Sequence, residues 1–333
     1  SFHHKDKMIL RVLLSLMASR NLLTAEGFKV MTFNVWHTGT EVTNGMEKIA
    51  KHILIVNPDV VTMQEFFVTN LTEILGLLGG NWTGEWHRGG QGIALLTRQP
   101  VVANSHIELP HGINLRIQLD TGREVSVWAM HLNYIDYGPY GPINNRTLEQ
   151  IMHSEYTTRV QDISELIHLP AFKEQLLHAD EVPVIVAGDF NCPSHLDWTE
   201  ENKAAHNGWV IEWPVTKLLV DESGLTDSFR ELFPDPTTVP GYTWSPVVHK
   251  QIWNNRPTAV EPMERLDFIF YRGSIKPIES VTYSGDRQIF LYPFQYHNDY
   301  PSDHRALITV FQDDRFPATT EERALHKTRG VQP

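Results

Sequence analysis

Apolar residues recur along the chain in short segments that are rich in β-branched and aromatic side chains. Segments of this length and composition predict β-strands. Val184, Ile185 and Val186 are consecutive and β-branched, which indicates a strand buried on both faces. The predicted strands cover residues 28–35, 59–65, 92–98, 113–119, 124–132, 182–190, 265–272 and 306–311.

Between the strand segments, apolar residues also occur at the three- and four-residue spacing of amphipathic helices. This spacing predicts a helix at 45–57, between the first two strands, and a longer helical region at 145–168. Strands interspersed with helices are typical of α/β layers. We therefore expect an α/β protein with two packed β-sheets flanked by helices.

The composition of the 333-residue chain is that of a globular protein, with 41% hydrophobic and 20% charged residues. This length allows two domains. The composition does not change in the manner of a linker between Phe28 and Phe311, so we expect one large domain at 26–313. The polar segment at 314–333 is expected to be a poorly ordered tail.

The N-terminal segment resembles a secretory signal peptide. After a short lead-in, Met8 begins a stretch with one early Arg, an apolar run from Val12 to Ala18 and a predicted cleavage site after Ala25. The run is too short to span a membrane. We therefore assign residues 1–25 to a lead-in and signal peptide, and expect a secreted protein that is not a transmembrane protein.

Two further features bear on the compartment. The single cysteine, Cys192, permits no intramolecular disulfide and by itself favours a reducing environment. Three sequons, at Asn70, Asn81 and Asn145, would be glycosylation acceptors in a eukaryotic secretory pathway, although each is equally an ordinary surface Asn. The leader outweighs the cysteine, and we expect a secreted glycoprotein.

The formal net charge of the chain is −12. A protein that attracts nucleic acid non-specifically is more often basic, so this charge argues against tight DNA binding. It leaves open a local basic groove, and it suits a metal site lined by carboxylates.

Polar residues of the types that hydrolytic enzymes use stand at or near the ends of six predicted strands. Each alone has a structural explanation as a turn residue, a cap or a surface group. An acid inside an apolar strand, such as Asp267, must be paired if it is buried. Their joint occurrence favours a shared site. They are Asn34, Glu65, His131, Asp189, Asn191, Asp267, Asp303 and His304.

The segments "FNVW", "VVTMQE", "MHL", "AGDFNCPS", "RLDFIFYRG" and "PSDHRAL" contain these residues. In order and spacing they resemble the motifs of the endonuclease/exonuclease/phosphatase superfamily, which includes deoxyribonuclease I, apurinic endonucleases, neutral sphingomyelinases and inositol polyphosphate 5-phosphatases. The resemblance covers residues 28–311. It implies a four-layered α/β sandwich with the active site at one edge of both sheets, and hydrolysis of phosphoric esters.

The resemblance implies a metal site. Glu65 would be the principal ligand of a divalent cation, usually Mg2+ with Mn2+ or Ca2+ as alternatives, and Asn34 and Asp303 would lie beside it. Mg2+ prefers oxygen ligands and keeps several waters, so one or two carboxylates suffice. Apurinic endonucleases carry an acid where this chain has Trp36, so a second ligand from this strand is not expected.

The remaining residues would carry the reaction. Asp189 and Asn191 would position the attacking water and the scissile phosphate. His304 would be either the general base or the hydrogen-bond donor to the transition state, and Asp267 would orient its imidazole. His131 would be a second imidazole that faces the phosphate. Whether Asp189 or His304 activates the water stays open.

Substrate specificity is expected in the loops beyond these motifs. The loop at 133–147 is dense in Tyr, Gly and Pro, and aromatic rings there suit stacking on a base, a sugar or a lipid head group. Packing within the loops is an equal explanation for each aromatic residue. The candidates for substrate contact are Tyr137, Tyr140, Arg146, His195 and Trp244.

Three functions are compatible with these residues. The first is a secreted nuclease-like phosphodiesterase, which we rank slightly ahead. The second is a phosphodiesterase or phosphatase for a lipid head group or a small metabolite, of the sphingomyelinase or inositol-phosphate kind. The third is a binding protein that has kept the fold and lost catalysis. For the enzyme we expect a phosphodiester substrate, no protein partner and a monomer.

Overall fold

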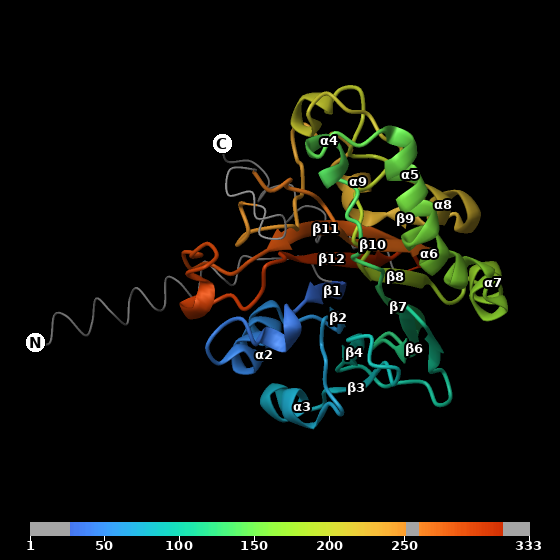
Figure 1. Ribbon diagram of the computed structural model, residues 1–333. Coiled ribbons are helices and arrows are strands. Elements are labelled where there is room, and N and C mark those ends of the chain that lie inside the picture. The colour runs from blue at the N-terminus through green and yellow to red at the C-terminus, as the bar shows by residue number, and fades with distance from the viewer. Residues whose placement is uncertain (1–26, 251–259, 316–333) are drawn as a thin grey trace, which may run out of the picture.

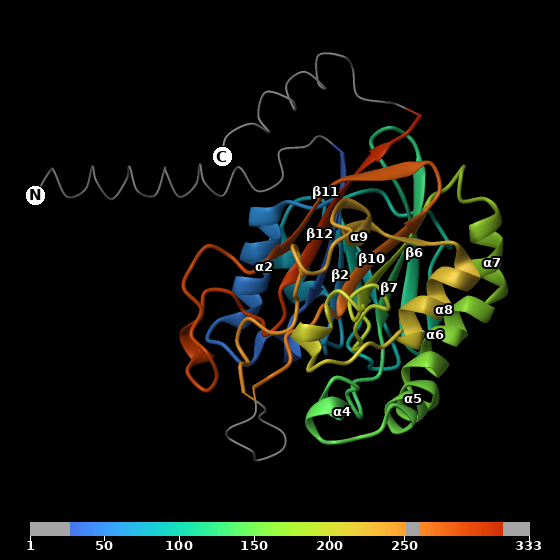
Figure 2. The same ribbon diagram turned by 90° about the horizontal axis from the view of Figure 1, so that it is seen from above.

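The computed structural model describes residues 27–250 and 260–315, so the predicted leader at 1–25 and residues 316–333 of the predicted tail lie outside the described residues. Two six-stranded sheets pack face to face with helices on their outer sides (Figures 1 and 2). The predicted α/β sandwich is therefore confirmed. Among the described residues, no helix has the length and apolar character needed to cross a membrane.

The first sheet has the strand order β11-β12-β1-β2-β4-β3. In it, β1 and β2 are parallel, and β12 and β4 run antiparallel to them. Its strands are β1 (Phe28–Asn34), β2 (Val60–Gln64), β3 (Thr83–Trp86), β4 (Ala94–Thr97), β11 (Ile275–Tyr283) and β12 (Ala306–Asp313).

The second sheet has the strand order β5-β6-β7-β8-β10-β9. In it, β7 and β8 are parallel, and β10 is antiparallel to β8. Its strands are β5 (Ile107–Leu109), β6 (Gly112–Gln118), β7 (Glu124–His131), β8 (Val184–Asp189), β9 (Thr226–Asp227) and β10 (Asp267–Arg272).

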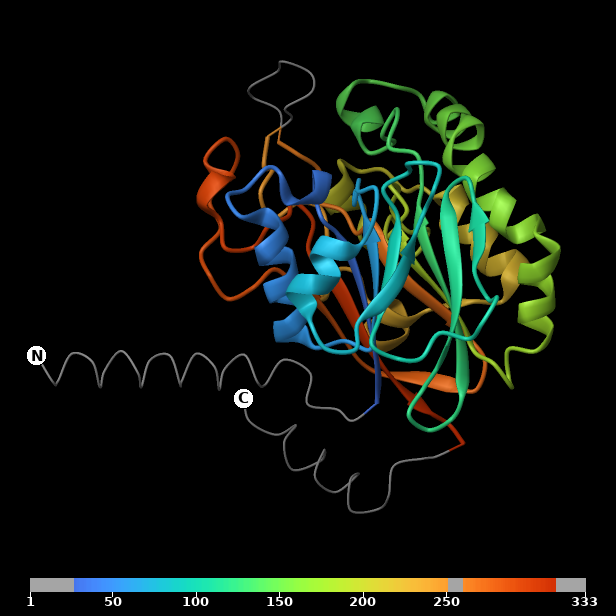
Figure 3. The same cartoon turned by 90° about the horizontal axis from the view of Figure 1, so that it is seen from below.

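Helices cover the outer faces of both sheets. The blue helices α2 and α3 lie on one side of the paired sheets and the green helices α5 to α7 on the other (Figure 3). The described helices are α2 (Gly45–Val56), α3 (Thr72–Leu78), α4 (Tyr140–Ile143), α5 (Leu148–Thr157), α6 (Arg159–His168), α7 (Pro170–Leu177), α8 (Pro214–Ser223) and α9 (Ser228–Leu232), with short 3-10 turns at η1 (His37–Gly39), η2 (Lys203–His206) and η3 (Gln295–His297).

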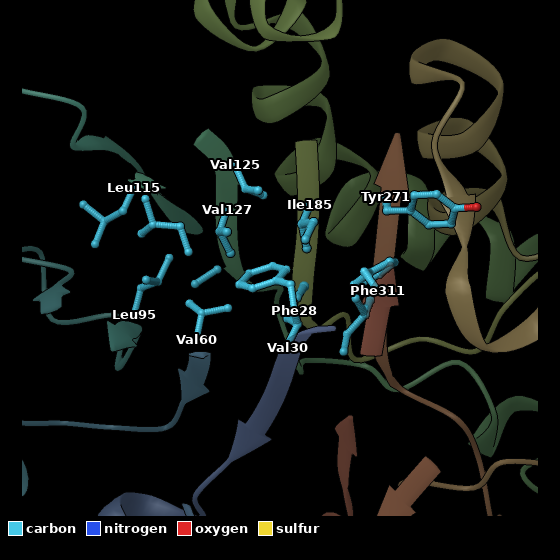
Figure 4. Close-up of a cluster of buried hydrophobic side chains, with 14 of the residues drawn as sticks. Phe28, Val30, Val60, Leu95, Leu115, Val125, Val127, Ile185, Tyr271 and Phe311 are labelled. Atoms are coloured by element: carbon cyan, nitrogen blue, oxygen red, sulfur yellow. The ribbon is translucent and has the colours of Figure 1, made fainter. Parts of the chain in front are cut away.

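The main hydrophobic core lies between the two sheets (Figure 4). Ile185 of β8 belongs to this inner core, whereas Val184 and Val186 belong to a second core beneath α6 and α7. All three side chains are fully buried. The prediction of a strand buried on both faces is confirmed, because alternate residues of β8 face the two layers.

The predicted helical region at 145–168 consists of two helices rather than one. They are separated at Thr158, whose backbone has φ −125° and ψ −97°. The hydroxyl groups of Thr157 and Thr158 both donate to carbonyl oxygens of the preceding turn. Such bonds compete with the helical pattern and bend helices, which accounts for the break.

Candidate active site

Strand pairing brings the polar residues predicted from the sequence to one edge of the two sheets. The parallel strands β1 and β2, and likewise β7 and β8, end at this edge, and the antiparallel strands β10 and β12 begin there. Asp189 at the end of β8 is paired with His131 on one side and with Asp267 on the other. The position of each residue in its strand therefore explains why these groups meet.

His304 and Asp267 form a buried pair. The distance from Nδ1 of His304 to Oδ2 of Asp267 is 2.9 Å, and both side chains are almost inaccessible to solvent. Nε2 of the same imidazole lies 3.8 Å from Oδ2 of Asp189. Burial alone would lower the pKa of His304, but the carboxylates of Asp267 and Asp189 outweigh it and raise this pKa to about 10. The imidazole is therefore positively charged at neutral pH.

Asn34 connects the two acidic sides of the site. Its Nδ2 donates to Oδ2 of Asp189 at 2.9 Å and to Oε1 of Glu65 at 3.2 Å. Its Oδ1 accepts from the backbone N–H of Trp36 at 3.0 Å, which fixes the orientation of the carboxamide. Asn34 therefore holds a carboxylate from each sheet in place.

Asn191 and Glu65 both stand on left-handed backbone, with φ of 51° and 57°. Such a conformation is uncommon for residues other than glycine and is found often at functional sites. The N–H of Asn191 donates to Oδ1 of Asp189 at 2.8 Å, and its side chain donates to the carbonyl of Leu132 at 2.9 Å. These hydrogen bonds hold Asp189 and Asn191 at the shared edge of the two sheets.

The oxygen groups at this edge fit a divalent cation. Among the described residues, Oδ1 of Asp303 and Oδ1 of Asp267 are buried carboxylate oxygens with no hydrogen-bond partner. Burial raises the pKa of Asp303 well above its usual value, and the charge of His304 opposes this only in part. One ligand atom each of Asp189, Asp267 and His304 lie within 4.8 Å of one another, but a protonated imidazole has no lone pair for a metal, so only the carboxylates of this group can hold a cation. Carboxylate oxygens are the ligands that hard divalent cations prefer.

His131 lies at the end of β7 and is half-buried. Its Nδ1 is 3.4 Å from the backbone carbonyl of Gln91. Since His131 is paired with Asp189 in the sheet, its imidazole belongs to the same edge as the buried pair.

The aromatic candidates for substrate contact are tied together by a residue that the sequence reasoning missed. Oε1 of Glu261 accepts from the hydroxyl of Tyr140 at 2.8 Å and from the indole N–H of Trp244 at 2.9 Å. The ring of Trp244 lies 4.9 Å from that of His304, and Tyr137 packs edge to face on Tyr140 at 5.0 Å. These aromatic residues therefore form one wall beside His304.

The other two candidates bind different parts of the protein. Arg146 donates to Asp136 and to the carbonyl of Gln150, which fixes the start of α5. Nδ1 of His195 lies 2.9 Å from the hydroxyl of Thr216 on α8. Their contact with substrate stays a prediction.

A second missed residue is His37. Its backbone N–H donates to Oε2 of Glu65 at 2.8 Å, and its Nε2 lies 3.4 Å from the same oxygen. Trp36, His37 and Thr38 all have left-handed backbone, with φ of 44°, 51° and 62°. The sequence after "FNVW" does not reveal this left-handed turn, so it does not identify His37 as a neighbour of Glu65.

Comparison with known proteins gives the family. The sequence model of the Endonuclease/Exonuclease/phosphatase family matches residues 31–304, a range that holds all eight polar residues at the strand ends. The chain belongs to this family. Its members are hydrolases that act on phosphoric esters, phosphodiesters among them.

Several known proteins are similar to this family member. A Caenorhabditis elegans protein described only as uncharacterized is 42% identical over 302 residues, which cover 90% of this chain and 94% of that protein. Truncated Caenorhabditis elegans TDP2 has a TM-score of 0.54 at 19% identity, with 85% of this chain and 97% of that one covered. The human Nocturnin catalytic domain with bound sulfate has a TM-score of 0.53 at 20% identity, with 86% and 94% covered. At such identities these two structures support the fold alone.

Proposed function

We propose that this protein hydrolyses phosphodiester bonds by attack of an activated water molecule. The observation that carries the proposal is the buried imidazole of His304, which contacts Asp267 at an edge where carboxylates and carboxamides from both sheets converge. The raised pKa of His304 agrees with a positive charge on this imidazole. Negative charge develops on the non-bridging oxygens of a phosphodiester during attack, and a preorganised positive group stabilises it. His304 therefore acts as a hydrogen-bond donor to these oxygens rather than as the base.

Asp189 is the residue that accepts the proton of the water. Its Oδ1 is bonded to the N–H of Asn191, and its Oδ2 to Asn34, so the carboxylate is held in one orientation. The bond from water oxygen to phosphorus forms while the bond to the leaving oxygen breaks, and the water proton moves to the carboxylate. The leaving oxygen keeps the electron pair of the broken bond and takes up a proton from solvent. Glu65 and Asp303 would hold a divalent cation, which when bound supplies further neutralisation of phosphate charge.

For the substrate, we propose nucleic acid as the first candidate. One similar structure is described as Danio rerio TDP2 in complex with a single-strand DNA product, with a TM-score of 0.51 at 15% identity. The wall of Tyr140 and Trp244 beside His304 suits stacking on a base.

A lipid head group or a small metabolite is the second candidate. Exposed apolar side chains occur close together in the segment 290–296, with Phe294 at 74% and Tyr296 at 56%. Exposed apolar groups favour contact with an amphipathic partner.

The test is hydrolysis of plasmid DNA, RNA, sphingomyelin and bis-p-nitrophenyl phosphate, with Mg2+, with Mn2+ and with EDTA. We expect metal-dependent cleavage of plasmid by the wild-type protein and none by Asp189→Asn. Asp120→Asn, at an exposed position, serves as the matched control. Cleavage of the lipid or the small diester with intact nucleic acid would replace the first candidate by the second. No hydrolysis of any substrate would contradict the proposed activity and would support a binding protein that has kept the fold and lost catalysis.

We further propose that the protein is secreted and glycosylated. In support, the side chains of Asn70, Asn81 and Asn145 are all exposed. Expression in eukaryotic cells would give a secreted protein whose apparent mass falls on treatment with an endoglycosidase. Conversion of the three residues to Gln would abolish that change, whereas retention of the wild-type protein inside the cell would contradict the proposal.

A further inference from the structure

His37 makes two contacts with the residue expected to bind the cation. The backbone N–H of His37 donates to Oε2 of Glu65 at 2.8 Å, and the imidazole Nε2 is 3.4 Å from that oxygen. More than half of the His37 side chain is exposed, and that of Glu65 is partly exposed, so solvent reaches both groups. The imidazole is therefore beside Glu65 without being part of the packed core.

The other nitrogen of the ring is also held. Nδ1 of His37 lies 3.2 Å from Oε1 of Glu41. If Nδ1–H donates to that carboxylate, Nε2 is left as an unprotonated nitrogen with its lone pair toward Glu65. A histidine that binds a metal through one nitrogen commonly donates the other N–H to a carboxylate, which fixes the tautomer and the ring orientation. The distances from His37 to Glu41 and Glu65 match this arrangement.

The backbone around His37 is held in an unusual conformation. Trp36, His37 and Thr38 are successive non-glycine residues with positive φ. The N–H of Thr38 donates to the carbonyl of Glu65 at 2.8 Å, and its hydroxyl accepts from the N–H of Phe67 at 2.8 Å. Left-handed backbone in such residues persists where the surroundings impose it, and it is concentrated at functional sites. Here it fixes the turn after β1 against the turn after β2.

We propose that His37 is a nitrogen ligand of the divalent cation held by Glu65, with Glu41 as the carboxylate that orients it. The proposal rests on the metal site of the proposed function and adds to it a ligand that the family motifs do not include. Transition-metal ions accept imidazole readily, whereas Mg2+ favours an all-oxygen environment. The mixed ligand set makes the site select Mn2+ over Mg2+.

The test uses the purified protein with Mn2+ as the probe, followed by pulsed electron paramagnetic resonance. We expect coupling of a histidine nitrogen to the bound Mn2+ in the wild-type protein and its loss in His37→Asn. Asn accepts left-handed backbone well, so this variant keeps the turn. His131→Gln is the matched control, because it removes another imidazole from the same edge, and it retains the coupling.

Calorimetric titration provides the second measurement. We expect His37→Asn to weaken Mn2+ binding by about 10- to 100-fold and Glu41→Ala by about tenfold, with little change for Mg2+. Glu47→Ala, at an exposed position nearby, leaves both affinities unchanged.

Two outcomes overturn the proposal. Coupling that persists in His37→Asn assigns the nitrogen to another residue. Bound Mn2+ without nitrogen coupling in the wild-type protein means that His37 is only an ion-pair partner of Glu65. In both cases, metal-dependent hydrolysis measured on the same samples shows whether the proposed function still stands.

Discussion

The substitution Asp267→Asn tests the electrostatic basis of the site. It removes the charge that faces His304 and keeps an oxygen that can accept from Nδ1–H at 2.9 Å. The pKa of His304 rises from 6.5 to about 10 in the folded protein. At about 1.4 kcal/mol for each tenfold change in proton affinity, this difference favours the charged imidazole in the folded state by about 5 kcal/mol. Burial raises the pKa of the Asp267 carboxyl, and this cost offsets part of that stabilisation.

The sign of the pH dependence follows from the direction of this shift. Because the pKa is higher in the folded state, the stabilisation is complete below pH 6.5 and is lost as the pH rises toward 10. In Asp267→Asn, the largest charge that raises the pKa of His304 is gone, although Asp189 still raises it, so the decrease in stability across that window is smaller. The difference in free energy of unfolding between wild type and variant should therefore shrink between these limits, by at most about 1.4 kcal/mol for each pH unit.

The assay is urea unfolding followed by tryptophan fluorescence at several pH values, in EDTA so that no metal contributes. At pH 6 we expect Asp267→Asn to be less stable by about 3–5 kcal/mol, the usual cost of removing one partner of a buried ion pair. Asp120→Asn, which is exposed, controls for the loss of a carboxylate. A difference between wild type and Asp267→Asn that stays constant from pH 6 to 10 would refute a charged His304.

Three further predictions concern the wall, the cysteine and the metal. Trp244→Phe and Tyr140→Phe each remove one hydrogen bond to the buried Glu261, so each should lower the free energy of unfolding by about 1.5–3 kcal/mol in thermal melts, and equal stability to wild type would argue against this wall. Burial raises the pKa of the Cys192 thiol, so a thiol reagent should label it only after unfolding, and rapid labelling of the native protein would contradict its position. Mn2+ at a hundred times its dissociation constant should raise the free energy of unfolding by about 2.7 kcal/mol, and no shift in the melting temperature would mean that the folded state holds no cation.

The eight strands that the sequence predicted are the interior strands of the two sheets, and each has a neighbouring strand on both sides. The four that it missed are β3, β5, β9 and β11, and all of them are edge strands. An edge strand is less enclosed and so carries a weaker apolar pattern, and β11 is interrupted by an irregularity at Pro277. Short edge strands are specified by pairing with a neighbour, which a local pattern does not reveal.

The residues of the candidate site also fall into those that the sequence predicted and those that it did not. Asn34, Glu65 and Asp189 were visible because each follows a strongly apolar strand, and strand ends are where parallel sheets collect polar groups. His37 and Glu261 were not visible, because their contacts depend on a left-handed turn and on loops that meet only in the folded chain. The pairing of Asp267 with His304 was predictable in kind, since a buried acid needs a partner, but its geometry was not.

The central claim is that the edge around Asp189 and His304 hydrolyses phosphodiesters with the help of a divalent cation. The most direct test is release of p-nitrophenol from bis-p-nitrophenyl phosphate by wild type, Asp189→Asn and the exposed control Asp120→Asn, each with Mn2+, with Mg2+ and with EDTA. We predict release by wild type and by the control that needs the metal, and a rate for Asp189→Asn that is lower by about 100-fold or more. Equal rates for wild type and Asp189→Asn, or release that persists in EDTA, would contradict the claim.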